Sequence, residues 1–210
     1  MFANQDSYRW VMLFGVWLLY FSFGLAVTSV APLVEYIRAD LNISYAAIGV
    51  ILGIWQFVYI GSAIPCGVLL DKLGPRFALC IGGAIIAVSL LARAFAPDFT
   101  IMLLAVMLFG VGGPIISAGA PKLVTGMFAG SSRGLAMGIY MTGPAIGGII
   151  SLTLTHSVLL PTLDNDWRQI MLLWAAVCAM CTVVWLLISS HRIARSEAAE
   201  VPETTQSQLT

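Results

Sequence analysis

A short polar segment, residues 67–76, holds the side chains with the clearest capacity for chemistry in this chain. It brings Asp71, Lys72 and Arg76 together, although only 10% of the whole sequence is charged. The carboxylate of Asp71 is placed to pair with Lys72 or Arg76, or to face the positive N-terminal end of a neighbouring helix. A charge pair of this kind would act as a latch between helices. The alternative is a loop whose charges only contact water.

The rest of the sequence carries no pattern typical of an enzyme. It lacks a nucleophile–base pair, an HExxH motif, a Walker loop and a carboxylate pair within an apolar run. The single CxxC motif has no second pair that would complete a zinc site, so we expect neither a metal nor a cofactor. We interpret all the cysteines as small apolar fillers, because each lies in an apolar run: Cys66, Cys80, Cys178 and Cys181.

The composition indicates that the solvent is mainly lipid. Hydrophobic residues make up 60% of the chain and the mean hydropathy is +0.95. Soluble domains carry about 25% charged residues, far more than this chain. The formal net charge of zero gives no indication of a nucleic-acid partner. The apolar run at residues 10–34 is too long for a cleavable signal peptide and should remain as the first membrane span.

The elements that must position the polar segment are long apolar helices. A helix rises about 1.5 Å per residue, so roughly 20 apolar residues cross the hydrocarbon core of a bilayer. We therefore predict an all-α membrane domain over residues 1–190, with a polar loop at residues 35–44 and a disordered cytoplasmic tail at 191–210. The six expected spans are residues 10–34, 45–70, 77–92, 99–121, 134–155 and 170–190.

The distribution of lysine and arginine predicts the orientation. Seven such residues lie on the side of the N-terminus and three on the opposite side. The positive-inside bias then places both termini and residues 67–76 in the cytoplasm, most simply at a bacterial inner (plasma) membrane. Arg93, Lys122 and His156 lie near span ends, where we expect long cations to extend to the membrane surface. Lys122 and Arg133 could attract an anion at the cytoplasmic mouth.

A solute site would have to use uncharged groups, because no charged residue lies in the middle of a span. Intramembrane charges usually mark proton and ion pathways, so the sequence shows no proton site. Hydroxyl, amide and aromatic groups favour a small polar or amphipathic solute. The alternative is hydrogen bonding between helices, worth about 0.6 kcal/mol per contact in lipid. The candidate lining residues are Trp17, Tyr20, Thr28, Gln56, Tyr59, Ser117, Tyr140 and Ser151.

Glycine and proline cluster in the fourth and fifth spans. Such residues either let helices pack closely or allow them to bend, as transporters require. The clustering in two adjacent spans favours bending. The candidates are Gly113, Pro114, Gly143, Pro144, Gly147 and Gly148.

The polar segment also carries a resemblance to a known family. Its residues resemble the signature loop between the second and third helices of the major facilitator superfamily, in which glycine, leucine, aspartate and basic residues recur at fixed spacing. Residues 143–148 resemble the GPxxGG core of that family's fifth-helix motif, and Trp167 and Arg168 resemble a pair common before its sixth helix. The resemblance implies a gating loop formed by Gly67, Asp71, Lys72, Gly74 and Arg76.

The resemblance further implies secondary transport by alternating access, with helices one, two, four and five around a central cavity. Two departures weaken a proton-driven drug-efflux role. Ile139 stands where the antiporter motif has glycine, and the fourth span contains no intramembrane arginine.

The length sets the remaining expectation. A full family member has about twelve helices in two halves, each a 3+3 inverted repeat. This chain corresponds to the N-terminal half, and residues 191–210 resemble the start of the central linker. We expect half of a split, dimeric or truncated transporter that needs a second six-helix half, as a separate chain or a second copy. The alternative is a non-transporting membrane half that binds or regulates a partner membrane protein.

Overall fold

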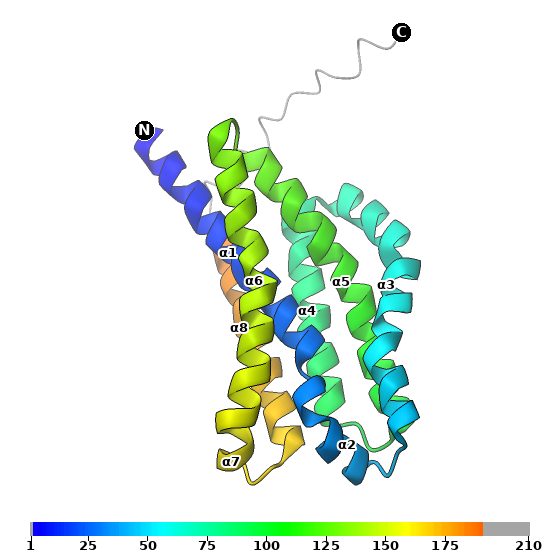
Figure 1. Cartoon of the computed structure of the whole chain (residues 1–210). Coiled ribbons are helices and arrows are strands. Elements are labelled where there is room, and N and C mark those ends of the chain that lie inside the picture. The colour runs from blue at the N-terminus through cyan, green and yellow to red at the C-terminus, as the bar shows by residue number, and fades with distance from the viewer. Residues whose placement is uncertain (1, 191–210) are drawn as a thin grey trace.

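The computed structural model describes residues 2–190, with side chains from Tyr8 onward, and this part of the chain is helical without any strand (Figure 1). Six segments are long and apolar enough to cross a membrane, which confirms the predicted all-α architecture. The expected disordered tail, residues 191–210, lies outside the described residues. The elements are α1 (Phe2–Thr28), η1 (Ala31–Leu33), α2 (Val34–Asp40), α3 (Tyr45–Leu73), α4 (Pro75–Ala94), α5 (Phe99–Met127), α6 (Ser131–Leu154), η2 (Thr155–Leu159), α7 (Leu160–Thr162) and α8 (Trp167–Ser190).

Several helices are longer than the apolar runs that predicted them. The first candidate span continues to Asp40, so the polar loop expected at residues 35–44 begins as the short helix α2. The fourth span extends to Met127 and the fifth covers Ser131–Thr162. The length of an apolar run indicates only the part of a helix that lies in the hydrocarbon core. The helix itself can continue into water beyond that run. The helices therefore extend beyond the expected spans, whose limits in the membrane stay a prediction.

The polar segment at residues 67–76 contains a tight turn, which is shorter than the gap between the two predicted spans. Gly67 lies inside α3, which runs to Leu73, and α4 begins at Pro75. Only Gly74 separates the two helices, with a φ of 75° that favours glycine. Proline suits the first position of α4 because its ring fixes φ and its missing N–H would have no helical partner there. Asp71 and Lys72 consequently lie on the last turn of α3, and not in a loop.

The helices pack in a repeating pattern. α1 packs most extensively against α6, α3 packs against α5, and α4 lies between α5 and α8. Figure 1 shows α3 at one edge of the bundle and α6 towards the other. If the first three spans correspond in order to the last three, α1 corresponds to α5 and α3 corresponds to α6. The α1–α6 pair then corresponds to the α5–α3 pair. This is the relation expected of a 3+3 inverted repeat.

Glycines allow the closest approaches within these pairs. A Cβ atom added to Gly24 of α1 would overlap the carbonyl oxygen of Pro144, and one added to Gly147 of α6 would overlap that of Phe21. In the other pair, a Cβ atom on Gly110 of α5 would lie 2.6 Å from the carbonyl oxygen of Trp55. Small residues serve this purpose in lipid, where the hydrophobic effect does not bring helices together.

Two ends of the bundle can be distinguished: the terminal end, where α1 begins and α8 ends, and the distal end, where α2 lies and α8 begins. At the terminal end, the Tyr8 hydroxyl donates to the carbonyl oxygen of Ile188, which ties α1 to α8. At the distal end, the Arg168 guanidinium donates to the carbonyl oxygens of Ala94 and Ala96, at 3.1 and 2.7 Å, and to Asp40 at 2.8 Å. Arg168 therefore joins α8 to α4 and α2.

Asp166 caps α8 beside this contact. Its carboxylate accepts hydrogen bonds from the Gln169 side chain at 2.9 Å and from the Arg168 backbone N–H at 2.9 Å. These bonds lower the pKa of Asp166 from its usual value, because they favour the charged form. The cap fixes the start of α8, and with it the position of Arg168.

The glycine contacts predict a local difference in stability. Gly147→Ala should lower the thermal unfolding temperature of the protein in detergent, because overpacking a tight contact costs about 1–3 kcal/mol. The control is Gly138→Ala on the same helix, where an added Cβ atom meets no heavy atom within 4 Å. The control should keep or slightly raise the unfolding temperature, since alanine favours helix by about 1 kcal/mol over glycine. Equal effects of the two substitutions would contradict this account of the packing.

Candidate functional site

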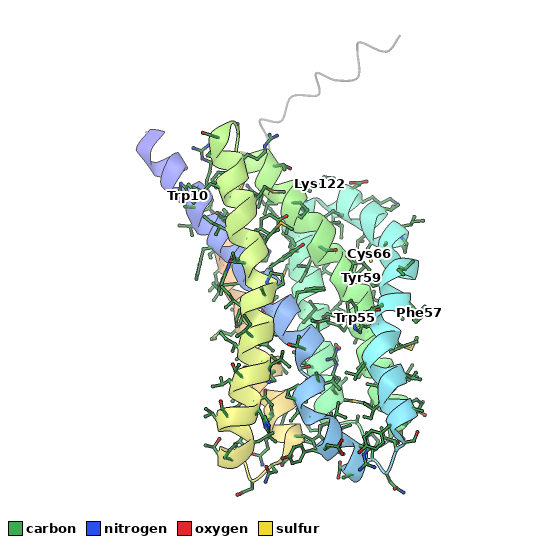
Figure 2. All side chains as sticks on the ribbon, viewed as in Figure 1. Trp10, Trp55, Phe57, Tyr59, Cys66 and Lys122 are labelled. Atoms are coloured by element: carbon green, nitrogen blue, oxygen red, sulfur yellow. The ribbon has the colours of Figure 1, made fainter. Side chains whose placement is uncertain are left out.

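Hydroxyl-bearing side chains from four helices contact one another inside the bundle. We call Tyr20 of α1, Tyr59 of α3, Ser117 of α5 and Tyr140 of α6 the phenol cluster. The Tyr59 and Ser117 hydroxyls are 2.6 Å apart, and the Tyr20 hydroxyl donates to the Ser117 carbonyl oxygen at 3.4 Å. The rings of Tyr20 and Tyr140 meet edge to face, with centroids 5.1 Å apart. Figure 2 places Tyr59 well inside the bundle, between its two ends.

Two prolines in α5 create the acceptors that this arrangement uses. Proline has no N–H, so Pro121 cannot bond the carbonyl of Ser117, and Pro114 cannot bond that of Gly110. In lipid, such released carbonyls need another donor. Tyr20 donates to the Ser117 carbonyl, and Ser62 of α3 donates to the Gly110 carbonyl at 3.1 Å. The carbonyls that the prolines leave unbonded are thus the acceptors through which α1 and α3 are hydrogen-bonded to α5.

Aromatic rings surround the cluster. Trp55 meets Tyr59 and Phe109 edge to face, with centroids 6.1 and 5.5 Å away, and Phe23 packs on Phe109 at 5.3 Å. Gly113 provides the space for this packing, because an added Cβ atom would lie 2.9 Å from the Tyr59 ring. Trp55 and Phe23 were not among the residues predicted from the sequence to line a site. Their helical spacing from Tyr59 and Tyr20 was the signal that would have identified them.

The structure does not bring the other predicted lining residues into the cluster. The Trp17 indole donates to the Thr142 hydroxyl of α6 at 2.9 Å, and Gln56 is exposed on α3. The Thr28 hydroxyl donates to the Gly24 carbonyl of its own helix at 3.0 Å. Ser151 is fully buried, and its hydroxyl has no hydrogen-bond partner among the described residues.

The predicted bend residues lie at helix contacts. α5 and α6 continue through Pro114 and Pro144 without a break. Gly143 and Gly147 face the α1 backbone, and Gly148 lies next to Thr28. The structure shows close packing at these residues, and bending about them stays a prediction.

Asp71 has a different partner from those expected. Its carboxylate lies 2.5 Å from the ammonium of Lys122, so the ion pair joins α3 to α5 instead of involving Lys72 or Arg76. Both side chains are largely exposed, at 71% for Asp71 and 48% for Lys122. An exposed pair of this kind contributes at most about 1 kcal/mol and can separate readily. The Arg76 carbonyl accepts a hydrogen bond from the Trp185 indole at 3.1 Å, which ties α4 to α8.

The cations of the predicted anion mouth already have acceptors within the chain. Lys122 pairs with Asp71, and Arg133 donates to the carbonyl oxygens of Phe128 and Thr125 at 3.0 and 3.2 Å. An anion would have to compete with these contacts. Among the described residues, no group of His, Cys, Asp and Glu could hold a metal ion.

Comparison with known proteins agrees with this architecture. The profile of the Major Facilitator Superfamily matches residues 16–208. The chain is 26% identical over 192 residues to an uncharacterised transporter, YycB, of Bacillus subtilis strain 168, covering 90% of this chain and 46% of the relative. It is 26% identical over 156 residues to a probable L-galactonate transporter of Escherichia coli strain K12, covering 74% of this chain and 34% of that protein.

A solved structure shows the same fold. It is a bacterial homologue of the human lysosomal transporter Spinster, in an inward-facing and unoccupied conformation, with a TM-score of 0.77 and 18% identity. The match covers 86% of this chain and 43% of that one. The chain thus spans less than half the length of the relatives described here. The profile match and the six spans together show that this multi-pass membrane protein belongs to the major facilitator superfamily.

Proposed function

We propose that this chain forms one half of a secondary transporter, which moves a small solute across the membrane by alternating access. The observation that carries the proposal is the phenol cluster, where polar side chains from α1, α3, α5 and α6 contact one another away from both ends of the bundle. The relatives described above are named as transporters, which supports a role in transport.

The chemistry of the cluster favours a small polar or amphipathic solute. Each phenol hydroxyl both donates and accepts hydrogen bonds, and the ring faces can pack against apolar carbon. The bond from Tyr20 to the Ser117 carbonyl is long, at 3.4 Å, so a solute hydroxyl or carbonyl could replace it. The name of the E. coli relative makes sugar acids the first compounds to test.

A second six-helix half would complete the site. α3 is the least buried span, and its exposed apolar side chains include Ile64 at 81% and Phe57 at 74%. Figure 2 shows Phe57 on the outer side of α3, away from the other helices. We propose that a second six-helix half packs on this face, with both termini cytoplasmic at an inner membrane. In this proposal the Asp71–Lys122 ion pair is a latch that holds α3 and α5 together at the terminal end of the bundle.

Reconstitution tests whether the chain transports alone. The purified chain is incorporated in liposomes, crosslinked, and offered radiolabelled hexonates, with hexoses and amino acids for comparison. We expect uptake together with a crosslinked dimer if a second copy completes the transporter. The alternative, a non-transporting partner protein, would be favoured by a monomer that takes up none of these compounds. The absence of uptake should then persist when a six-helix chain encoded by an adjacent gene is produced together with it.

Asp71→Asn should lower uptake several-fold, up to about fivefold, while leaving membrane insertion intact, because the exposed ion pair contributes at most about 1 kcal/mol. The substitution keeps the shape of the side chain but removes the charge that pairs with Lys122. Uptake and the amount of inserted protein are measured in the same vesicles. Lys72→Gln is the matched control, because it removes the adjacent exposed charge and should preserve most uptake. Normal uptake by a correctly inserted Asp71→Asn variant would contradict the latch.

Tyr59→Phe should weaken solute binding roughly 3- to 10-fold, which is the usual effect of losing one neutral hydrogen bond. The ring and its contact with Trp55 are retained, so only the hydroxyl next to Ser117 is lost. The measurement is the KM for uptake. Tyr45→Phe is the control, since that hydroxyl lies at the distal start of α3 and bonds Glu35. An equal change in both variants would exclude the phenol cluster as the solute site.

A further inference from the structure

Arg93 occupies a position that its sequence context did not predict. We expected the side chain to extend to the membrane surface, but it is only 1% exposed. Among the carboxylates of residues 8–190, none lies within ion-pair distance of it. A buried cation without compensation is strongly destabilising, so other groups must neutralise Arg93.

The C-terminus of α1 supplies part of the compensation. Arg93 is in the last turn of α4, and its Nη1 donates to the carbonyl oxygen of Ala26, near the end of α1, at 2.9 Å. Nη1 also lies 3.1 Å from the hydroxyl of Ser29, just beyond α1. A helix C-terminus carries about −0.5 of an elementary charge, which favours a cation at this position. Phe109 adds a ring 5.4 Å from the guanidinium carbon.

The sequence explains why α1 ends at this point. The hydroxyls of Thr28 and Ser29 bond back to the carbonyl oxygens of Gly24 and Ala26 at 3.0 and 2.9 Å, and such bonds bend helices. Pro32 has no N–H to offer the Thr28 carbonyl. The first span is therefore interrupted between α1 and η1, although its apolar character continues to α2. Arg93 contacts the chain at this interruption.

The repeat-related helix has a similar end. α5 corresponds to α1 in the inverted repeat, and Arg133 donates to two carbonyl oxygens at its C-terminus. Arg9 lies 3.4 Å from a third, that of Met127. Arg133 is exposed at the terminal end, whereas Arg93 is buried at the distal end. The Nε of Arg93 has no hydrogen-bond partner among the described residues, so the guanidinium has a spare donor.

We propose that Arg93 is a positioning residue whose hydrogen bonds hold the interruption of the first span in one arrangement. When these bonds are released, the interruption acts as a hinge. Residues 29–34 move relative to α1 when the guanidinium exchanges its acceptors at Ala26 and Ser29. The hinge lies within the described half, so it depends on neither the solute nor the second half.

Hydrogen–deuterium exchange of the purified chain in detergent tests the hinge. Arg93→Met should raise amide exchange in residues 29–34 about tenfold, because it removes hydrogen bonds from a charged donor, and should leave α3 unchanged. Arg93→Lys keeps the charge and should restore exchange to within about threefold of the wild type. A uniform increase over all helices, or none, would overturn the proposal, as would a failure of lysine to rescue.

Two further variants keep the test decisive. Arg168→Met removes the neighbouring distal contacts at Ala94 and Ala96, and it should not raise exchange in residues 29–34. Should Arg93→Met not fold, Ser29→Ala removes one of the two acceptors and should raise exchange there about threefold. An unchanged Ser29→Ala variant, or an Arg168→Met variant that opens the same residues, would contradict the hinge.

Discussion

Every backbone carbonyl that a proline releases inside a bilayer needs a replacement donor, and this requirement shapes the centre of the bundle. Pro114 and Pro121 release two carbonyls on α5, and side chains of α3 and α1 satisfy them. The residues that interrupt the hydrogen bonding of α5 therefore determine how its neighbours pack on it. They also concentrate hydroxyl groups in a region where an apolar helix would offer none.

Close glycine contacts divide the bundle into two helix pairs that meet at these hydroxyls. Tyr20 and Tyr140 belong to the α1–α6 pair, whereas Tyr59 and Ser117 belong to the α3–α5 pair. Within each pair the backbones approach so closely that a single added Cβ atom would clash. Within the cluster, the pairs are linked by the 3.4 Å bond between the Tyr20 hydroxyl and the Ser117 carbonyl, whereas the Tyr20–Tyr140 ring contact lies inside the α1–α6 pair. Relative movement of the pairs would change this bond before it disturbs either pair.

The sequence was sufficient to predict the fold class and the six spans, because both depend on apolar runs whose length is set by the bilayer. The spacing of Gly67, Asp71 and Gly74 indicated the family. Helix ends were less predictable, because the single-residue turn at Gly74 depends on a backbone φ that hydropathy does not report. The partner of Asp71 was unpredictable for another reason: Lys122 is far away in the sequence, and only the packing of α3 on α5 brings the two together.

The two ends of the bundle each combine contacts that change easily with contacts that do not. Asp71 and Lys122 are exposed side chains that can rotate apart into water at little energetic penalty. Arg93 and Arg168 instead bind backbone carbonyls, whose positions are fixed by whole helices. Arg133 at the terminal end likewise donates to the carbonyl oxygens of Phe128 and Thr125, and Arg168 at the distal end also pairs with the exposed Asp40. Each end therefore has an exposed ion pair that can separate first and guanidinium–carbonyl bonds that a helix end can leave only when another acceptor replaces them.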